Sequence, residues 1–302
     1  MTTSYATQQV EFPSSGETLI GDLYVPTTEP GRRCPAVIVV GAWGTVKEQM
    51  PGGYAREMAS RGYLALTFDF RGWGGSTGRP RSMEDPFAKA ADIVAAAEFL
   101  GSRPDVARDA IGGIGICAGS AYMATAATRT EFIRSVALVA PALPSRATVE
   151  EQLGGQPGVT AVLSMAREAR DEYDSTGNER LVPAVPPMPE DSVDEPDYYH
   201  DRTRGAVPQW NNTFNPASWL SWLEYDAHAA AAALTDPLLI VHSEAAVKPD
   251  SVREFIALVP GEVRQIWLDD VTQFDFYDRP GPMQLAGEAM ADHFASLSRA
   301  KI

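Results

Sequence analysis

A cysteine between two glycines is the first feature of this sequence that could carry out chemistry. Cys117 lies in the Gly-x-Cys-x-Gly run of residues 115–119, directly after the apolar stretch 111–116. This pattern after a strand is typical of a tight strand-to-helix turn that exposes a nucleophilic side chain. A buried structural cysteine is the alternative, since cysteine is among the most buried residue types. The flanking glycines favour the nucleophile, here a thiol.

The bulk composition is that of an acidic protein with one large core. The 302 residues, 44% hydrophobic and 22% charged, suffice for an α/β core with an inserted segment. A net charge of -15 and a pI near 4.7 argue against nucleic acid or an anionic membrane as partner. No stretch is apolar enough to span a membrane, and residues 1–10 lack a secretion signal, so a cytoplasmic location is expected. Two cysteines make no disulfide framework, and we expect neither metal nor cofactor.

Strand patterns set the architecture that must position this thiol. Residues 10–12 and 19–25 alternate in polarity and are expected to pair as an antiparallel hairpin at a sheet edge. Mostly continuous apolar runs, typical of strands buried on both faces, follow at 36–40, 64–68, 111–116, 136–139, 237–241 and 263–268. Because helical segments lie between these runs, we predict a mostly parallel, doubly wound sheet that binds ligands at the carboxyl ends of its strands.

One of those helices can be placed from its start signal. Asp85 is a suitable N-cap, and Pro86 is favourable in the first helical turn. Helical spacing then predicts a common apolar face for Phe87, Ala90, Ala91, Val94 and Ala97.

Residues 144–235 interrupt the alternation and are predicted to form an inserted, mainly helical cap, which leaves 1–143 and 236–302 as the core. Helices are expected over 150–173 and 216–233. The proline cluster Pro183 to Pro189 is expected to be a solvated connector rather than a substrate contact. The many aromatic residues of the segment suit a largely apolar ligand.

Several runs together resemble α/β hydrolases of the dienelactone-hydrolase-related group, which includes bacterial hydrolases with a cysteine at the elbow. The matching stretches, in order along nearly the whole chain, are 44–49, 69–76, 113–120 at the elbow, 242–244 after the acid-bearing strand and 272–278 in the histidine loop. The resemblance implies the α/β-hydrolase fold, with a mostly parallel doubly wound sheet and a cap.

Two positions depart from the catalytic triad that the resemblance implies. Residues 245–247, Ala-Ala-Val, stand where relatives place an aspartate, and Gln273 stands where they place the catalytic histidine. A glutamine amide does not titrate and cannot act as a base. A thiol is partly ionised near neutral pH, so covalent chemistry through Cys117 survives the loss. The resemblance thus implies a degenerate triad with Cys117 and Gln273 at catalytic positions.

The oxyanion hole of the family, by contrast, is expected to persist. The backbone N–H groups of Ala118 and Trp43 would form it, whatever their side chains. The Trp43 side chain either lines the pocket or packs against the cap. The glycine-rich loop 71–76 is expected to be a structural turn held by Asp69 and Ser76 rather than a phosphate cradle.

Candidate pocket residues come from this loop and from the cap. Trp73 is the member of the loop that is best placed to reach the cleft, and Tyr199 and Trp210 are the aromatic candidates from the cap.

Four histidines are the remaining candidates for a base. His293 falls in a predicted C-terminal helix, 286–297, where a surface or packing role is expected. His242, at the end of a buried strand, is expected to be a hydrogen-bonded structural residue. His200 and His228 lie in the cap; either could face the pocket as an acid or base, but an ordinary surface role is favoured for each. Their spacing indicates no metal site.

Three functions remain open at this point. The leading hypothesis is an enzyme that converts a small carbonyl or acyl metabolite without hydrolysis, by cyclisation, isomerisation, elimination or carbon–carbon bond formation. The second is an esterase, lactonase or thioesterase with a substitute base. The third is a protein that binds a ligand without catalysis. A homodimer is compatible with each.

Overall fold

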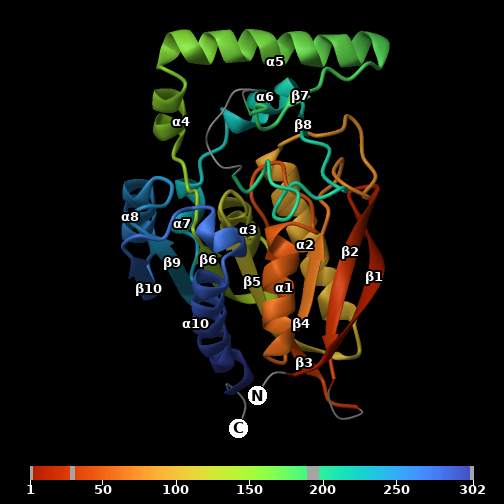
Figure 1. The fold of residues 1–302 in the computed structure, drawn as a ribbon, viewed down its shortest axis with the longest axis vertical. Coiled ribbons are helices and arrows are strands. Elements are labelled where there is room, and N and C mark those ends of the chain that lie inside the picture. Colours follow the sequence, from red (N-terminus) through yellow and green to blue (C-terminus); the bar gives the residue numbers. More distant parts are fainter. Residues whose placement is uncertain (1–2, 28–30, 189–196, 300–302) are drawn as a thin grey trace.

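An eight-stranded sheet forms the centre of the protein, for which the computed structural model describes residues 3–27, 31–188 and 197–299. The strand order is β1-β2-β4-β3-β5-β6-β9-β10 (Figure 1). The strands are β1 (Tyr5–Ser14), β2 (Glu17–Pro26), β3 (Cys34–Val40), β4 (Leu64–Phe68), β5 (Val106–Ile116), β6 (Ile133–Val139), β9 (Leu238–Ser243) and β10 (Val263–Leu268). The predicted mostly parallel sheet is confirmed: within it, β2 alone runs in the direction opposite to the other strands.

The two edges of the sheet differ from each other. The predicted hairpin at one edge is confirmed and is longer than expected, with β1 and β2 joined through Ser15 and Gly16, both at positive φ. At the other edge, the prediction of a strand buried on both faces is wrong for β10. Arg264 and Gln265 are exposed there, because β10 has a neighbour on one side only.

Helices cover both faces of the sheet, as a doubly wound fold requires. One face packs against α1 (Met50–Ser60) and α10 (Pro280–Arg299), and the other against α2 (Pro86–Ser102), α3 (Gly119–Ala127) and α8 (Pro249–Leu258) (Figure 1). Helix α10 includes the predicted 286–297 and begins earlier. None of the helices in the described ranges is long and apolar enough to cross a bilayer.

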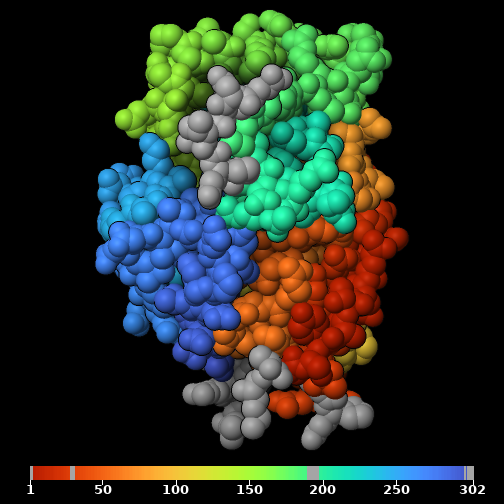
Figure 2. Space-filling model, viewed as in Figure 1, coloured from red at the N-terminus to blue at the C-terminus, as the bar shows by residue number. Residues whose placement is uncertain are grey.

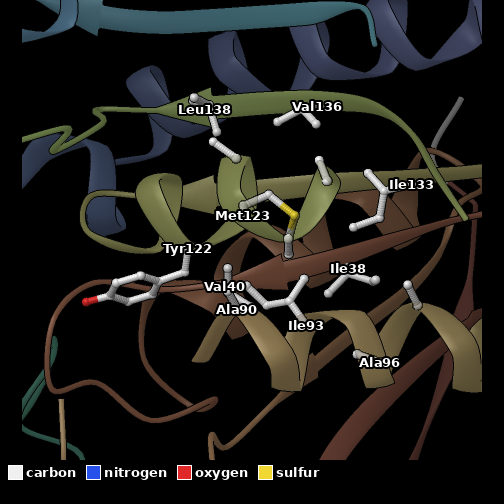
Figure 3. Packing of buried hydrophobic residues seen from close by; sticks show 14 of the residues in the cluster. Ile38, Val40, Ala90, Ile93, Ala96, Tyr122, Met123, Ile133, Val136 and Leu138 are labelled. Atoms are coloured by element: carbon white, nitrogen blue, oxygen red, sulfur yellow. The ribbon is translucent and has the colours of Figure 1, made fainter. Parts of the chain in front are cut away.

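Helix α2 starts where predicted but buries a different face. The Asp85 carboxylate accepts hydrogen bonds from the N–H groups of residues 87 and 88, as expected of an N-cap. Ala90 and Ile93 are buried against β3 and α3 (Figure 3), whereas Phe87 is 38% exposed. The predicted apolar face is rotated around the helix relative to the buried one. The reason is that Lys89 and Asp92 lie on the buried face, where each forms an ion pair.

Most of the segment between β6 and β9 lies beyond the carboxyl ends of the core strands (Figure 1), and its green helices form one end of the molecule in Figure 2. Its elements are α4 (Arg146–Gln152), α5 (Gln156–Thr176), β7 (Val182–Pro183), β8 (Thr213–Phe214), the 3₁₀ turn η1 (Pro216–Ser218), α6 (Trp219–Trp222) and α7 (His228–Ala231). A short α9 (Asp275–Asp278) precedes α10.

The prediction of two helices in this segment is partly wrong. The first is broken into α4 and α5 at Gly154 and Gly155, which both have positive φ. The second is reduced to short turns, and Asp226 starts a new one by accepting a hydrogen bond from the N–H of His228. Pro189, the last residue of the proline cluster, lies outside the described residues.

Candidate active site

Cys117 occupies a strained turn between β5 and α3. Its φ is +54°, and its N–H donates to the carbonyl of Val139 at the end of β6. A Cβ on Gly115 would lie 2.5 Å from the backbone of α3, and one on Gly119 would lie 2.4 Å from the Gly41 carbonyl oxygen. The flanking glycines therefore permit close packing, while the strained backbone belongs to Cys117 itself.

Three hydrogen-bond donors surround the Cys117 sulfur. Burial raises the pKa of the thiol, and hydrogen bonds from the Tyr277 hydroxyl, the Ala118 N–H and the Gln273 amide offset part of that rise. The thiol is therefore mostly protonated at neutral pH. Among the described residues that line the pocket at this sulfur there is no histidine.

Gln273 joins this sulfur to the loop after β9. Its Oε1 accepts from the Val247 N–H at 3.1 Å, and its Nε2 donates to the Ala140 carbonyl at 2.9 Å and to the Tyr277 hydroxyl at 3.3 Å. The side chain is 9% exposed. Gln273 thus lies between the sulfur and the loop 245–247, which is the arrangement that the resemblance implies for a base and its acid.

Two tyrosine hydroxyls extend the hydrogen bonds of Cys117 and Gln273 further from the sulfur. Tyr277, on α9, contacts the sulfur and Gln273, and the Tyr199 hydroxyl hydrogen-bonds to Tyr277. Burial raises the pKa of both phenols well above the ordinary value, so both stay neutral proton donors. Tyr277 was not among the predicted site residues, although it belongs to the same loop, 272–278, that the resemblance marked.

A pocket of about 420 Å³ opens onto Cys117. Its walls come from the elbow, from residues 142–153, from α6 and from residues 247–251. Trp43 lines it and also packs on Trp222 and Trp219, with ring centroids 4.5 and 5.5 Å apart, so both roles considered for this side chain apply. The α6 tryptophans and Lys248 were not among the predicted site residues. The lining is otherwise largely apolar and suits an acyl chain or a similar group.

The two expected oxyanion donors lie in segments that touch. Gly119, after the elbow, packs on the Gly41 carbonyl that precedes Trp43. Among the described residues, no protein oxygen accepts a hydrogen bond from the N–H of Trp43 or Ala118. Both amides can therefore bind a substrate carbonyl oxygen, and Ala118 also contacts the sulfur.

The loop that carries Trp43 is fixed at the next residue, Gly44, which has a φ of +64°. Its N–H donates to the Glu84 carboxylate at 3.0 Å, and its carbonyl accepts from the Trp210 indole at 2.7 Å. Glu84 is fully buried and also accepts from Lys89 and from the Tyr122 hydroxyl. Trp210 therefore holds the loop that carries Trp43 and does not line the described pocket, where it was predicted.

Comparison with known proteins agrees with this geometry. The family model described as "Alpha/beta hydrolase family" matches residues 36–286. The chain belongs to the alpha/beta hydrolase family. The predicted family and fold are thereby confirmed, while the narrower dienelactone-hydrolase-related group and the degenerate triad stay predictions.

Three relatives of this alpha/beta hydrolase are informative. The solved structure of hypothetical protein PA2218 from Pseudomonas aeruginosa superposes with a TM-score of 0.86 at 25% identity, over 97% of this chain and 94% of that one. In sequence, the PA2218 match is 45% identical over 102 residues, 34% of this chain and 28% of that protein. Thiohydrolase aneE of Aspergillus aculeatus is 30% identical over 181 residues, 60% of this chain and 54% of its own. Polyketide transferase claH of Penicillium crustosum is 35% identical over 133 residues, 43% of each chain.

Trp73 of this alpha/beta hydrolase is a core residue rather than a pocket residue. It is 2% exposed, its indole donates to the Met83 carbonyl at 2.8 Å, and its ring lies over the Lys89 ammonium. The loop around it is the expected structural turn: Asp69 accepts from the Gly75 N–H, and Ser76 donates to the Asp69 carbonyl. The hypothesis that Trp73 reaches the cleft is wrong because its indole is satisfied inside the core.

The two cap histidines are hydrogen-bonded away from the sulfur. His200 contacts Asp197 and the Pro186 carbonyl, each at 2.8 Å, and the carbonyl contact raises the pKa of the ring. His228 contacts the Leu143 carbonyl at 3.0 Å. Neither lines the described pocket. Both rings are therefore half-buried and support the structure of the segment between β6 and β9, rather than lying on the surface as favoured.

The two histidines of the core differ in burial: His293 is half-buried and His242 is fully buried. His293 contacts Ser135 and backbone carbonyls, in keeping with a packing role. His242 is fully buried against Trp267, and neither ring nitrogen makes a hydrogen bond of normal geometry within the described structure. The expectation of a hydrogen-bonded His242 is therefore wrong. Burial lowers the pKa of His242 to about 4, so the ring is neutral at physiological pH.

The buried His242 makes the fold sensitive to acid. In the unfolded chain its pKa returns to about 6.5, so the unfolded state binds more protons between that pH and 4. The contribution to stability is complete above pH 6.5 and falls by about 3 kcal/mol as the pH drops to 4. Urea unfolding at pH 7 and pH 4.5 should show a smaller loss for His242→Phe than for the natural chain. His200→Gln is the control, because the pKa of His200 is shifted the other way. Equal losses in His242→Phe and the natural chain would contradict the assignment.

Proposed function

We propose that this alpha/beta hydrolase family member transfers acyl groups that arrive as thioesters, with Cys117 as the first acceptor and a nucleophile other than water as the final one. One observation carries the proposal. The sulfur at the elbow lies beside a neutral phenol, a glutamine amide and a backbone N–H, and no histidine is among the described residues that line its pocket. Such a site suits carbonyl activation better than the activation of water.

The first step would exchange one thioester for another. The Cys117 sulfur attacks the substrate carbonyl, whose oxygen is held by the N–H groups of Ala118 and Trp43. A new bond forms between Cys117 and the acyl carbon, the substrate C–S bond breaks, and the departing thiol takes the proton of Cys117. A thiolate has a conjugate-acid pKa near 8.5 and leaves without strong acid catalysis, unlike an alkoxide. A thioester therefore needs the lost histidine less than an oxygen ester does.

The second step decides the product. Water is a poor nucleophile without a base, and Gln273 cannot supply one. A thiol, an amine or a stabilised carbanion within the acyl chain can attack the acyl-enzyme unaided. The bond from Cys117 to the acyl carbon then breaks, and the departing thiolate takes up the proton that the acceptor has given up: that of its S–H or N–H group or, for a carbanion, that of the parent C–H group. The product is a new thioester, an amide, or a ring or chain closed by a carbon–carbon bond.

The pocket and the relatives support this choice of substrate. A pocket of about 420 Å³ with largely apolar walls fits an acyl chain better than a charged metabolite. Residues 148–153 and the α6 tryptophans help to form those walls, and we accordingly propose that the segment 144–235 acts as the cap. Two relatives carry the names thiohydrolase and polyketide transferase, and both names refer to the chemistry of thioesters or acyl chains.

Incubation with hexanoyl N-acetylcysteamine should leave one hexanoyl group on Cys117, visible by intact-protein mass spectrometry. Release to water should be slow, and added 2-mercaptoethanol or butylamine should accelerate it. Because burial raises the pKa of the Cys117 thiol, the rate of acylation should still be rising at a pH above the ordinary cysteine pKa of about 8.5.

The second cysteine of the chain provides the matched control. Cys34 is 4% exposed, so Cys34→Ala should label like the natural chain and Cys117→Ala should not label. Thermal stabilisation by the probe without any adduct would favour a binding protein instead. Fast release to water that acceptors do not change would favour a cysteine-dependent thioesterase.

A further inference from the structure

Lys248 is the one charged side chain in the wall of the Cys117 pocket, as far as the described residues go. It lies at the exposed mouth, directly after Val247, whose N–H binds Gln273. The other lining side chains are apolar, aromatic or uncharged polar groups. A single ammonium group therefore places a positive charge at one end of an otherwise uncharged pocket.

The acidic residues nearest in sequence do not neutralise this ammonium. Glu244 and Asp250 both bind Arg253, the latter at 3.0 Å. Within the described part of the chain, no carboxylate oxygen lies within 4.0 Å of the Lys248 nitrogen. As far as those residues go, the positive charge is available to a ligand.

The remaining lysines show how unusual this availability is. Lys89 is buried in an ion pair with Glu84, and Lys47 is buried beside Asp69 at 3.7 Å. Lys301 lies outside the described residues. In a chain with a net charge of -15, an ammonium at a pocket mouth that no described carboxylate pairs with is a local site of attraction for anions.

We infer that Lys248 selects substrates that carry an anionic oxygen group beside the reacting thioester. The inference rests on the proposed function, which supplies the thioester. The anionic group has two possible sources: a carboxylate on the far end of the acyl chain, or a phosphate on the arm that bears the thiol. The chemistry of recognition by an ammonium is the same for both.

The backbone at Lys248 allows a clean substitution. Its φ of +50° and ψ of +57° place it in the left-handed region, which asparagine tolerates better than lysine. Lys248→Asn therefore removes the charge without adding backbone strain, and its melting temperature should not fall. Lys248→Arg keeps the charge and serves as the matched control.

Rates of Cys117 acylation with three probes test the inference. Hexanoyl N-acetylcysteamine is the neutral probe, adipoyl N-acetylcysteamine places a carboxylate on the acyl chain, and hexanoyl-coenzyme A places phosphates on the thiol arm. Lys248→Asn should slow one or both anionic probes about two- to fivefold more than it slows the neutral probe. Lys248→Arg should match the natural chain, and the difference should shrink at high salt. The probe that responds identifies the source of the anion.

The inference and the proposed function fail in different ways. Equal effects of Lys248→Asn on all three probes overturn the inference and leave the acyl transfer intact. Absence of acylation by every probe in the natural chain overturns the proposed function. In that event, thermal stabilisation of Cys117→Ala by adipate or by coenzyme A, compared with that of Cys117→Ala/Lys248→Asn, decides the inference separately. Stabilisation that does not depend on Lys248 overturns it.

Discussion

The double variant Ala246→Asp/Gln273→His should release an acyl group from Cys117 to water on the order of 100-fold faster than the natural chain. Gln273 already contacts the sulfur and, through its Oε1, the N–H of Val247 in the loop that contains Ala246. An imidazole at position 273 would have a similar reach and could take a proton from water. An aspartate at position 246 would hold the ring in one tautomer.

The pH profile of the double variant provides the diagnostic measurement. A histidine base works only when neutral, so the rate of release should rise with pH through an apparent pKa near 6.5. The natural chain should lack that inflection. The single variants are the controls: Gln273→His alone should gain less, because nothing orients the ring, and Ala246→Asp alone should gain nothing. An intact double variant with neither the gain nor the inflection would show that residue 273 is not at the position of a base.

Much of the core could be predicted because local patterns specify it. Continuous apolar runs indicated strands buried on both faces, and their alternation with helices required a parallel sheet. The two glycines around Cys117 located the elbow, since no side chain fits where Gly119 meets the Gly41 carbonyl. The family resemblance added Gln273, which no local pattern would have marked.

The parts that escaped prediction depend on contacts between distant residues. Glu84 lies far in sequence from Gly44 and Tyr122, and only the folded chain brings its carboxylate to both. Because Lys89 and Asp92 are charged, their hydropathy predicted that they lie on the exposed side of α2. The predicted apolar face of α2 therefore differed from the face that is buried. In the cap segment, the short turns of 216–231 follow from local caps such as Asp226 rather than from apolar spacing.

Removal of the Glu84 carboxylate should have the largest effect on stability. Glu84 and Lys89 are both buried, with the Lys89 ammonium 2.7 Å from each carboxylate oxygen. Burial lowers the pKa of Lys89 and the attraction of Glu84 raises it, so without Glu84 the cation is left uncompensated. Glu84→Leu should therefore reduce the free energy of unfolding by about 3–5 kcal/mol, measured by urea titration. The second substitution Lys89→Met should restore most of that loss, because two apolar side chains of similar volume can replace a buried ion pair.

A comparison of two double variants then separates stability from the positioning of the oxyanion loop. Glu84→Gln/Lys89→Met removes both charges but keeps an amide oxygen that can accept from the Gly44 N–H, whereas Glu84→Leu/Lys89→Met removes the acceptor as well. The Leu variant should acylate Cys117 about 10- to 100-fold more slowly than the Gln variant, since small displacements of an oxyanion donor weaken its hold on the transition state. Equal rates in two equally stable variants would mean that Glu84 stabilises the core only, and that Trp210 suffices to hold Gly44 in place.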